Sequence, residues 1–199
     1  MDIFIIKDKI KRGYYKLLSR LVYSKVFLSF GKGSKIISPL SIKNAEYITI
    51  GMNVTINHGI FMMVEPSNPF VKEPRLSICD GTVIGNFNHI VSLNKVVIGK
   101  GVLTADRVYI SDNYHGYEDI SNPVSVQQVK SKGETIIGDG SWIGENCSII
   151  SAKIGRHCIV AANSVVISDI PDYSLAAGAP AKIKKKYNIE TKLWEKVKK

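Results

Sequence analysis

One histidine in a polar segment is a candidate acid–base group. His115 lies in Asp112-Asn113-Tyr114-His115-Gly116-Tyr117-Glu118, so a carboxylic acid stands three residues away on each side. A neutral imidazole within hydrogen-bond reach of a hydroxyl can take its proton while the oxygen attacks an electrophile. Asp112 or Glu118 could hold the second ring nitrogen and fix the tautomer. The alternative is that His115 is a polar loop residue without chemistry.

The other histidines and the cysteines do not suggest a metal site. His58, His89 and His157 fall at turn or corner positions. A histidine zinc site would need a closely spaced pair of histidines near a third, and the sequence has no such pair. The sequence has three cysteines, Cys79, Cys147 and Cys158. They form no CxxC pair, and their number is odd. We therefore expect no metal, no disulfide framework and a reducing compartment.

A six-residue period predicts the elements that must position His115. The recurring position is isoleucine or valine except at Thr104, and its members are Ile50, Ile56, Ile78, Ile84, Ile90, Ile98, Thr104, Ile110, Ile137, Ile143, Ile149, Ile154, Val160 and Val166. Four residues after these positions, small or β-branched residues and one asparagine recur, namely Val54, Thr82, Asn88, Val102, Val108, Ser141, Cys147, Cys158 and Ser164. A helix is excluded, because a six-residue spacing drifts by roughly 120° per step around it. Short parallel strands stacked in roughly five or six coils fit, which predicts an all-β fold, a parallel β-helix of hexapeptide repeats.

The period divides the chain into three parts. Residues 31–181 are expected to form the β-helix, with two interruptions at 63–75 and 112–135 that should be extruded as loops. Residues 182–199 form a basic tail that could be a short helix from Thr191 onward. No stretch resembles a signal-peptide core or a membrane span, so we expect a cytoplasmic protein.

Residues 1–30 are predicted to form an amphipathic, basic helical segment. Its apolar residues recur at helical spacing and are Ile10, Tyr14, Leu17, Leu18, Leu21 and Val22. The remaining faces hold the basic residues Lys9, Lys11, Arg12, Lys16 and Arg20. The apolar stripe could cap the open end of the β-helix. Alternatively, the segment could also rest on an anionic membrane in a peripheral contact.

The formal net charge of +10 favours anionic partners but does not identify them. Lysines and arginines are concentrated at both ends of the chain, while charges in the middle are nearly balanced. No zinc finger, helix-turn-helix or aromatic-interleaved basic motif is present, so we do not expect a nucleic-acid partner.

Several segments resemble the hexapeptide-repeat acyltransferases, specifically the sugar O-acetyltransferases of the maltose, galactoside and polysaccharide-modifying type. They are Asn86-Phe87-Asn88, Ile98-Gly99, the His115 segment, Trp142-Ile143-Gly144 and Ala176-Ala177-Gly178-Ala179-Pro180-Ala181-Lys182. The resemblance implies a left-handed coil, a homotrimer with active sites between neighbouring prisms, acetyl-coenzyme A as co-substrate, and His115 as the base.

The resemblance also implies roles for further residues. Asn86 matches a family asparagine that faces the active site, although it could equally serve a turn; Tyr117 and Glu118 are the other candidates for binding the acceptor. The expected coenzyme A contacts are Trp142, Gly144, Ala162, Ser168, Lys182 and Lys185. The lysines would face phosphates as point charges, unless they belong to a solvated basic tail.

The function expected on these grounds is O-acetylation of a sugar in surface polysaccharide or glycolipid biosynthesis. An N-acetyltransferase of an amino sugar or a xenobiotic acetyltransferase is the enzymatic alternative. An inactive β-helical scaffold is the alternative without catalysis.

Overall fold

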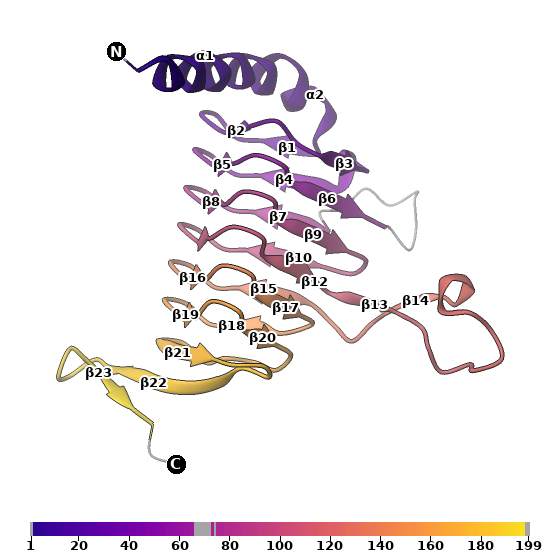
Figure 1. The fold of residues 1–199 in the computed structure, drawn as a ribbon, viewed down its shortest axis with the longest axis vertical. Coiled ribbons are helices and arrows are strands. Elements are labelled where there is room, and N and C mark those ends of the chain that lie inside the picture. Colours follow the sequence, from indigo (N-terminus) through magenta and orange to yellow (C-terminus); the bar gives the residue numbers. More distant parts are fainter. Residues whose placement is uncertain (1, 66–72, 74, 198–199) are drawn as a thin grey trace.

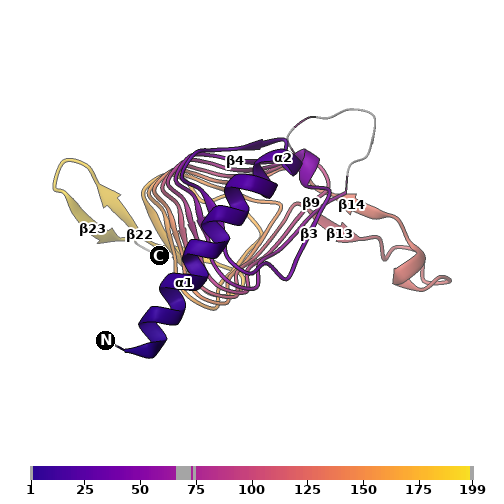
Figure 2. The same ribbon diagram turned by 90° about the horizontal axis from the view of Figure 1, so that it is seen from above.

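Three parallel sheets wind around a common axis and form a three-sided β-helix (Figures 1 and 2). The computed structural model describes residues 2–65, 73 and 75–197. Successive strands of the chain lie on successive faces, and each pairs in parallel with the strands one coil earlier and one coil later. Two of the sheets contain six strands each, so the described chain completes six coils.

The strands are short on all three faces. The first sheet consists of β1 (Ser29–Phe30), β4 (Ile48–Ile50), β7 (Leu76–Ile78), β10 (Val96–Ile98), β15 (Thr135–Ile137) and β18 (Lys153–Ile154). The second, nine-stranded sheet consists of β2 (Lys35–Ile36), β5 (Thr55–Ile56), β8 (Val83–Ile84), β11 (Leu103–Thr104), β16 (Trp142–Ile143), β19 (Ile159–Val160), β21 (Ser174–Ala177), β22 (Lys182–Asn188) and β23 (Leu193–Lys196). The third consists of β3 (Ser41–Lys43), β6 (Phe61–Val64), β9 (His89–Ser92), β12 (Tyr109–Ser111), β17 (Ser148–Ile150) and β20 (Val165–Val166).

The six-residue period is the spacing of the buried core, as predicted. Every recurring position between Ile50 and Val166 is at most 1% exposed, Thr104 included. The second set of small residues is equally buried and includes Cys147 and Cys158. Burial raises the pKa of both thiols, which therefore act as packing groups.

A helical segment covers the N-terminal end of the coil. It consists of α1 (Ile3–Leu18), a π-helical stretch η1 (Ser19–Tyr23) and α2 (Ser24–Val26), and it crosses the end of the prism diagonally (Figure 2). The segment is tied to the first coil where the buried Ser19 hydroxyl accepts a hydrogen bond from the Ile36 backbone N–H at 3.1 Å. None of the helices among residues 2–65, 73 and 75–197 is long and apolar enough to cross a bilayer.

The apolar stripe faces the coil only in part: its member Leu18 is half-buried, whereas most of the others are exposed. Ile10, Tyr14 and Leu17 are 68%, 60% and 56% exposed. The helix instead turns the half-buried Tyr15 and Leu18 toward the coil. The hydrogen bond to the first coil is made at the C-terminal end of the helical segment, where Ser19 accepts from the Ile36 backbone.

The C-terminal helix expected from Thr191 is not formed. β22 pairs antiparallel with β21, and β23 pairs antiparallel with β22. The last coil leaves an unpaired sheet edge, and a returning strand satisfies its backbone groups. A helix of about nine residues would gain no such hydrogen bonds to the sheet edge to offset the free-energy cost of starting a helix.

The two predicted loops differ in what the structure describes. Most of 63–75 lies outside the described residues. The second excursion begins after β12 and contains β13 (Asn113–His115), a 3₁₀ turn η3 (Val124–Val126) and β14 (Val129–Ser131). A further 3₁₀ turn, η2 (Ala45–Tyr47), precedes β4.

Candidate active site

His115 lies on a paired strand that extends away from the β-helix. β13 and β14 form an antiparallel hairpin in which His115 is opposite Val129. The Gly116 N–H donates to the carbonyl oxygen of Gln128 at 3.0 Å, which continues the pairing past the histidine. The side chain of His115 is exposed. The hairpin therefore presents the imidazole to solvent from a backbone with defined pairing.

The base of the hairpin is fixed by the carboxylate of Asp112, which is fully buried. It accepts hydrogen bonds from three consecutive backbone N–H groups, at 2.8 Å from Leu93 and 2.7 Å from Asn94, and also from Lys95. On the other strand, the Ser131 hydroxyl donates to the carbonyl oxygen of Asp112 at 2.6 Å. Both strands are thus anchored to the turn that follows β9.

The two carboxylates expected to orient His115 are engaged elsewhere. In the described part of the chain, no hydrogen bond or ion pair joins His115 to Asp112 or Glu118. Glu118 instead accepts from the Lys130 ammonium at 2.9 Å, and this hydrogen bond lowers the pKa of Glu118. The partners of Asp112 fix the base of the hairpin, and which group orients the His115 ring stays a prediction.

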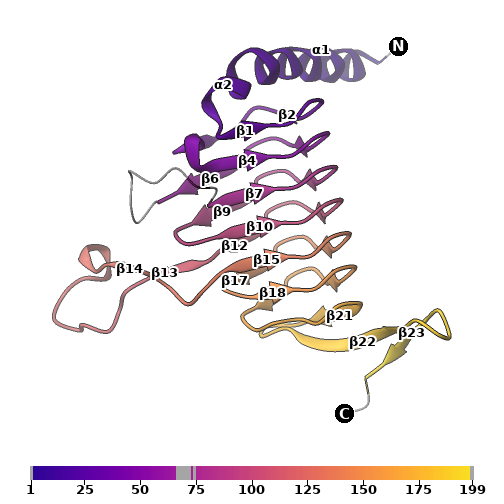
Figure 3. The same ribbon diagram turned by 180° about the vertical axis from the view of Figure 1, so that it is seen from behind.

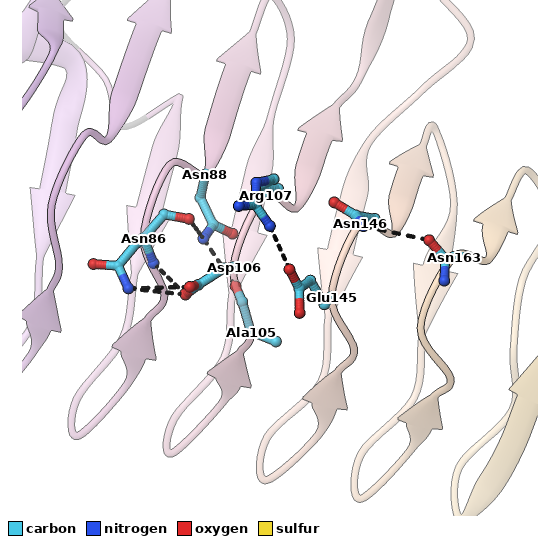
Figure 4. A network of polar contacts seen from close by, with 8 residues as sticks. All are labelled: Asn86, Asn88, Ala105, Asp106, Arg107, Glu145, Asn146 and Asn163. Atoms are coloured by element: carbon cyan, nitrogen blue, oxygen red, sulfur yellow. Dashed lines mark hydrogen bonds and ion pairs between the residues drawn. The ribbon is translucent and has the colours of Figure 1, made fainter.

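Asn86 stabilises a corner between two coils (Figure 4). Its side-chain amide donates to both carboxylate oxygens of Asp106 at 3.1 Å, and its side-chain oxygen accepts from the His58 backbone N–H at 3.2 Å. Along the same corner, Arg107 pairs with Glu145 of the next coil. These contacts fit the alternative stated for Asn86 above, in which the asparagine stabilises a turn and does not bind the acceptor.

Trp142 and Lys185 belong to one outward-facing column on the nine-stranded sheet. Trp142 is in register with Ile159, Ile159 with Leu175, and Leu175 with Lys185. With ~4.8 Å between strands, the three steps from Trp142 to Lys185 span about 14 Å. Lys182 lies on the same strand as Lys185 and is exposed. The column therefore has an aromatic ring at one end, aliphatic side chains in the middle and Lys185 at the other end, with Lys182 beside it in register with Ala177.

The remaining predicted contacts lie at corners of the coil. Gly144 and Ala162 come from adjacent coils, and a Cβ on Gly144 would lie 2.5 Å from the Ala162 nitrogen, so only glycine fits there. Gly144 follows directly on the strand that contains Trp142, and Ala162 lies two residues after the strand that contains Ile159. Ser168 is exposed and follows β20, so it lies beyond the third sheet and away from the column.

The two halves of the predicted site lie on opposite sides of one chain. Figure 2 shows the β13–β14 hairpin at one edge of the prism and β22–β23 at the other, and Figure 3 agrees. A single chain therefore does not bring His115 to the column from Trp142 to Lys185.

The other histidines have structural surroundings. The His89 ring packs 4.3 Å from Phe61 and 5.5 Å from Tyr109, and burial lowers the pKa of His89. His157 stacks on Tyr173 with 5.8 Å between ring centres. Across residues 2–65, 73 and 75–197, no group of three or more His, Cys, Asp or Glu side chains could hold a metal ion.

Lys130 on the returning strand and Lys132 just after it were not predicted as site residues from the sequence. Lys130 pairs with Glu118, and the Lys132 ammonium lies 5.3 Å from the centre of the Tyr114 ring. Both join the two arms of the hairpin around His115. Their alternating spacing is the signal that could have indicated a strand opposite residues 113–115.

In sequence and in fold, the chain is similar to known acyltransferases. The chain is 34% identical to WbbJ of Escherichia coli K12, a proposed lipopolysaccharide biosynthesis O-acetyl transferase, over 92% of this chain and 93% of WbbJ. It is 32% identical to the assigned acetyltransferase Rv3034c of Mycobacterium tuberculosis over 91% of this chain and 56% of that protein. Its fold matches the N-acyltransferase AntD of Bacillus cereus, solved with dTDP and coenzyme A, with a TM-score of 0.70, 20% identity and coverage of 88% and 90%. No family model matches the chain.

Proposed function

The chain belongs to the hexapeptide-repeat acyltransferases and is an acetyl-coenzyme A dependent transferase; we propose that its acceptor is a hydroxyl of a sugar in surface polysaccharide or glycolipid biosynthesis. The main support for this acceptor is the 34% identity with WbbJ along nearly the whole of both chains. The exposed histidine on a preformed hairpin gives that similarity a chemical basis.

His115 is proposed as the general base. Its neutral imidazole takes the proton of the sugar hydroxyl as the oxygen attacks the thioester carbon, which can increase the rate by about 10² to 10⁴. The new bond joins the sugar oxygen to the acetyl carbon, the carbon–sulfur bond breaks, and the proton passes from the imidazolium to the departing thiolate. Tyr117 and Glu118, next to it on the hairpin, are the proposed acceptor-binding residues.

The column from Trp142 to Lys185 has a composition that suits coenzyme A. An aromatic and aliphatic surface matches a pantetheine arm, and ammonium groups match phosphates. We propose that Trp142 contacts the arm, that Lys182 and Lys185 face the phosphates, and that Gly144 and Ala162 supply backbone groups. Ser168 is retained as a weaker candidate because it lies away from the column.

The separation of His115 from this column supports a homotrimer. An active site between neighbouring prisms would combine the hairpin of one copy with the column of the next. We also propose that the coil is left-handed, as in the family, since a solenoid of the opposite hand could not superpose along its length on a left-handed relative.

Acceptor and donor can be tested together by measuring thiol release from acetyl-coenzyme A with a panel of glycans, lipid-linked sugars and amino sugars. We expect release with hydroxyl acceptors and none from buffer alone. A clear preference for amino sugars would indicate an N-acetyltransferase. Absence of release with every acceptor, in a preparation that binds coenzyme A, would favour an inactive scaffold.

The shared site can be tested by mixing two inactive variants. His115→Ala and Trp142→Ala proteins, unfolded and refolded together, should regain part of the activity, because some interfaces would contain neither substitution. An active monomer in light scattering would contradict the proposal.

A further inference from the structure

The outer side of α1 is an apolar surface that no described part of the chain covers. Its members follow helical spacing, and they are Ile3, Ile10, Tyr14 and Leu17 of α1 and Leu21 of the adjoining η1, each at least 55% exposed. On the other side, Ser19 at the start of η1 ties the helical segment to the first coil through its hydrogen bond with Ile36. We call these five residues the outer stripe.

Basic residues border the outer stripe on both sides. With 100° per residue, Lys9, Lys16 and Arg20 align along one border, and Lys7 and Lys11 along the other. The only acidic residue of α1, Asp8, is paired with Arg12 at 2.7 Å. A neutral apolar partner would contact the outer stripe but not the basic residues on its two sides. A surface with anionic groups outside and an apolar interior would contact both.

A basic cavity adjoins the first of these borders. It has a volume of about 520 Å³, lies between α1 and the first coil, and is lined by Lys16, Arg20 and Lys32 together with the backbone of Gly31 and Gly33. No acidic residue is among its lining residues. Two of its cations are thus shared with the border of the outer stripe, and the cavity is large enough for a phosphate-bearing headgroup.

We propose that α1 is a membrane-surface helix, which inserts its outer stripe among the acyl chains of an anionic lipid layer and holds lipid phosphates with its basic borders and the adjoining cavity. α1 lies across the end of the prism, so the coil axis would stand away from the membrane (Figures 1 and 2). The hairpin bearing His115 leaves the fourth coil, about 14 Å along the axis from the first. A sugar attached to a lipid carrier could then reach the site. The binding step itself does not depend on the proposed acetyl transfer.

The test is co-sedimentation of the full chain with phosphatidylcholine vesicles that either contain or lack phosphatidylglycerol, at low and high salt. The full chain should bind the anionic vesicles and release at high salt. Changing Lys9, Lys16 and Arg20 to Gln should weaken the partition coefficient by about a hundredfold, roughly fivefold per cation. The matched control changes the exposed Lys184, Lys186 and Lys196 to Gln at the opposite end, with the same loss of charge, and should bind like the unmodified chain.

A second variant distinguishes insertion from electrostatic adsorption. A tryptophan introduced by Tyr14→Trp should show blue-shifted emission with anionic vesicles and be quenched by lipids brominated on their acyl chains. All substituted positions are exposed, and equal thermal unfolding would show that the variants fold. Three results would overturn the proposal: no binding to anionic vesicles at low salt, equal loss of binding in both triple variants, or an outer stripe whose substitution changes only the oligomeric state.

Discussion

Replacing Asp112 with asparagine separates a positioning role from a direct contact with His115. The carboxylate accepts three backbone N–H groups of the turn at residues 93–95, and charge-assisted hydrogen bonds of this kind contribute about 1.5–3 kcal/mol each. Asparagine keeps one oxygen and directs an amide nitrogen at a backbone donor. One bond is lost and the others become neutral, so we expect a loss of about 3 kcal/mol in the free energy of unfolding.

The assay combines chemical denaturation, hydrogen exchange and steady-state kinetics. Backbone amides of 93–95 and of β13 should exchange faster in Asp112→Asn, and kcat should fall because the hairpin bearing His115 is less well held. Coenzyme A affinity should be unchanged. The control is Asp80→Asn, whose half-buried carboxylate accepts one backbone bond from Met52 at 2.7 Å and should cost about 1 kcal/mol without altering kcat. A hundredfold loss of kcat with unchanged stability and exchange would refute the positioning role.

Other substitutions test the core and the donor surface. Gly144→Ala should destabilise the coil strongly, since its Cβ would lie 2.5 Å from the next coil, whereas Gly13→Ala in α1 meets open space and should stabilise by about 1 kcal/mol; thermal unfolding compares the two. Ile143→Ala should cost about 3–4 kcal/mol in denaturant titrations, because the side chain is fully buried. Cys147 and Cys158 should remain unmodified by a thiol reagent in the native protein and react only on unfolding, since burial raises the pKa of both; rapid native labelling would contradict their burial.

The coil could be predicted from the sequence because its core repeats one requirement many times. In each coil, every strand points one apolar side chain into the core. The six-residue period of these residues is therefore visible in the sequence without knowledge of long-range contacts. The C-terminal strands could not be predicted in this way. Lys182 to Lys196 has no recurring pattern, and its structure depends on the free sheet edge left by β21.

The candidate site was only partly predictable for a similar reason. A motif identified His115, but the partners of Asp112 are backbone groups about twenty residues earlier, which no side-chain pattern reveals. Asn86 was assigned to the acceptor from its motif, while its contacts with Asp106 arise from coil stacking. The contact of the helical segment with the coil could be read only in part from amphipathicity, because Leu18 belongs to the apolar stripe whereas the polar Ser19 makes the hydrogen bond to Ile36.

The central claim is tested most directly by the His115→Ala variant in single-turnover and steady-state measurements with acetyl-coenzyme A and an accepted sugar. The exposed ring has no structural hydrogen bond among the described residues, so the variant should fold and bind coenzyme A as the unmodified chain does. We predict that the rate of acetyl transfer falls at least about a hundredfold. Transfer that continues at the original rate would show that the base is another group and would contradict this account.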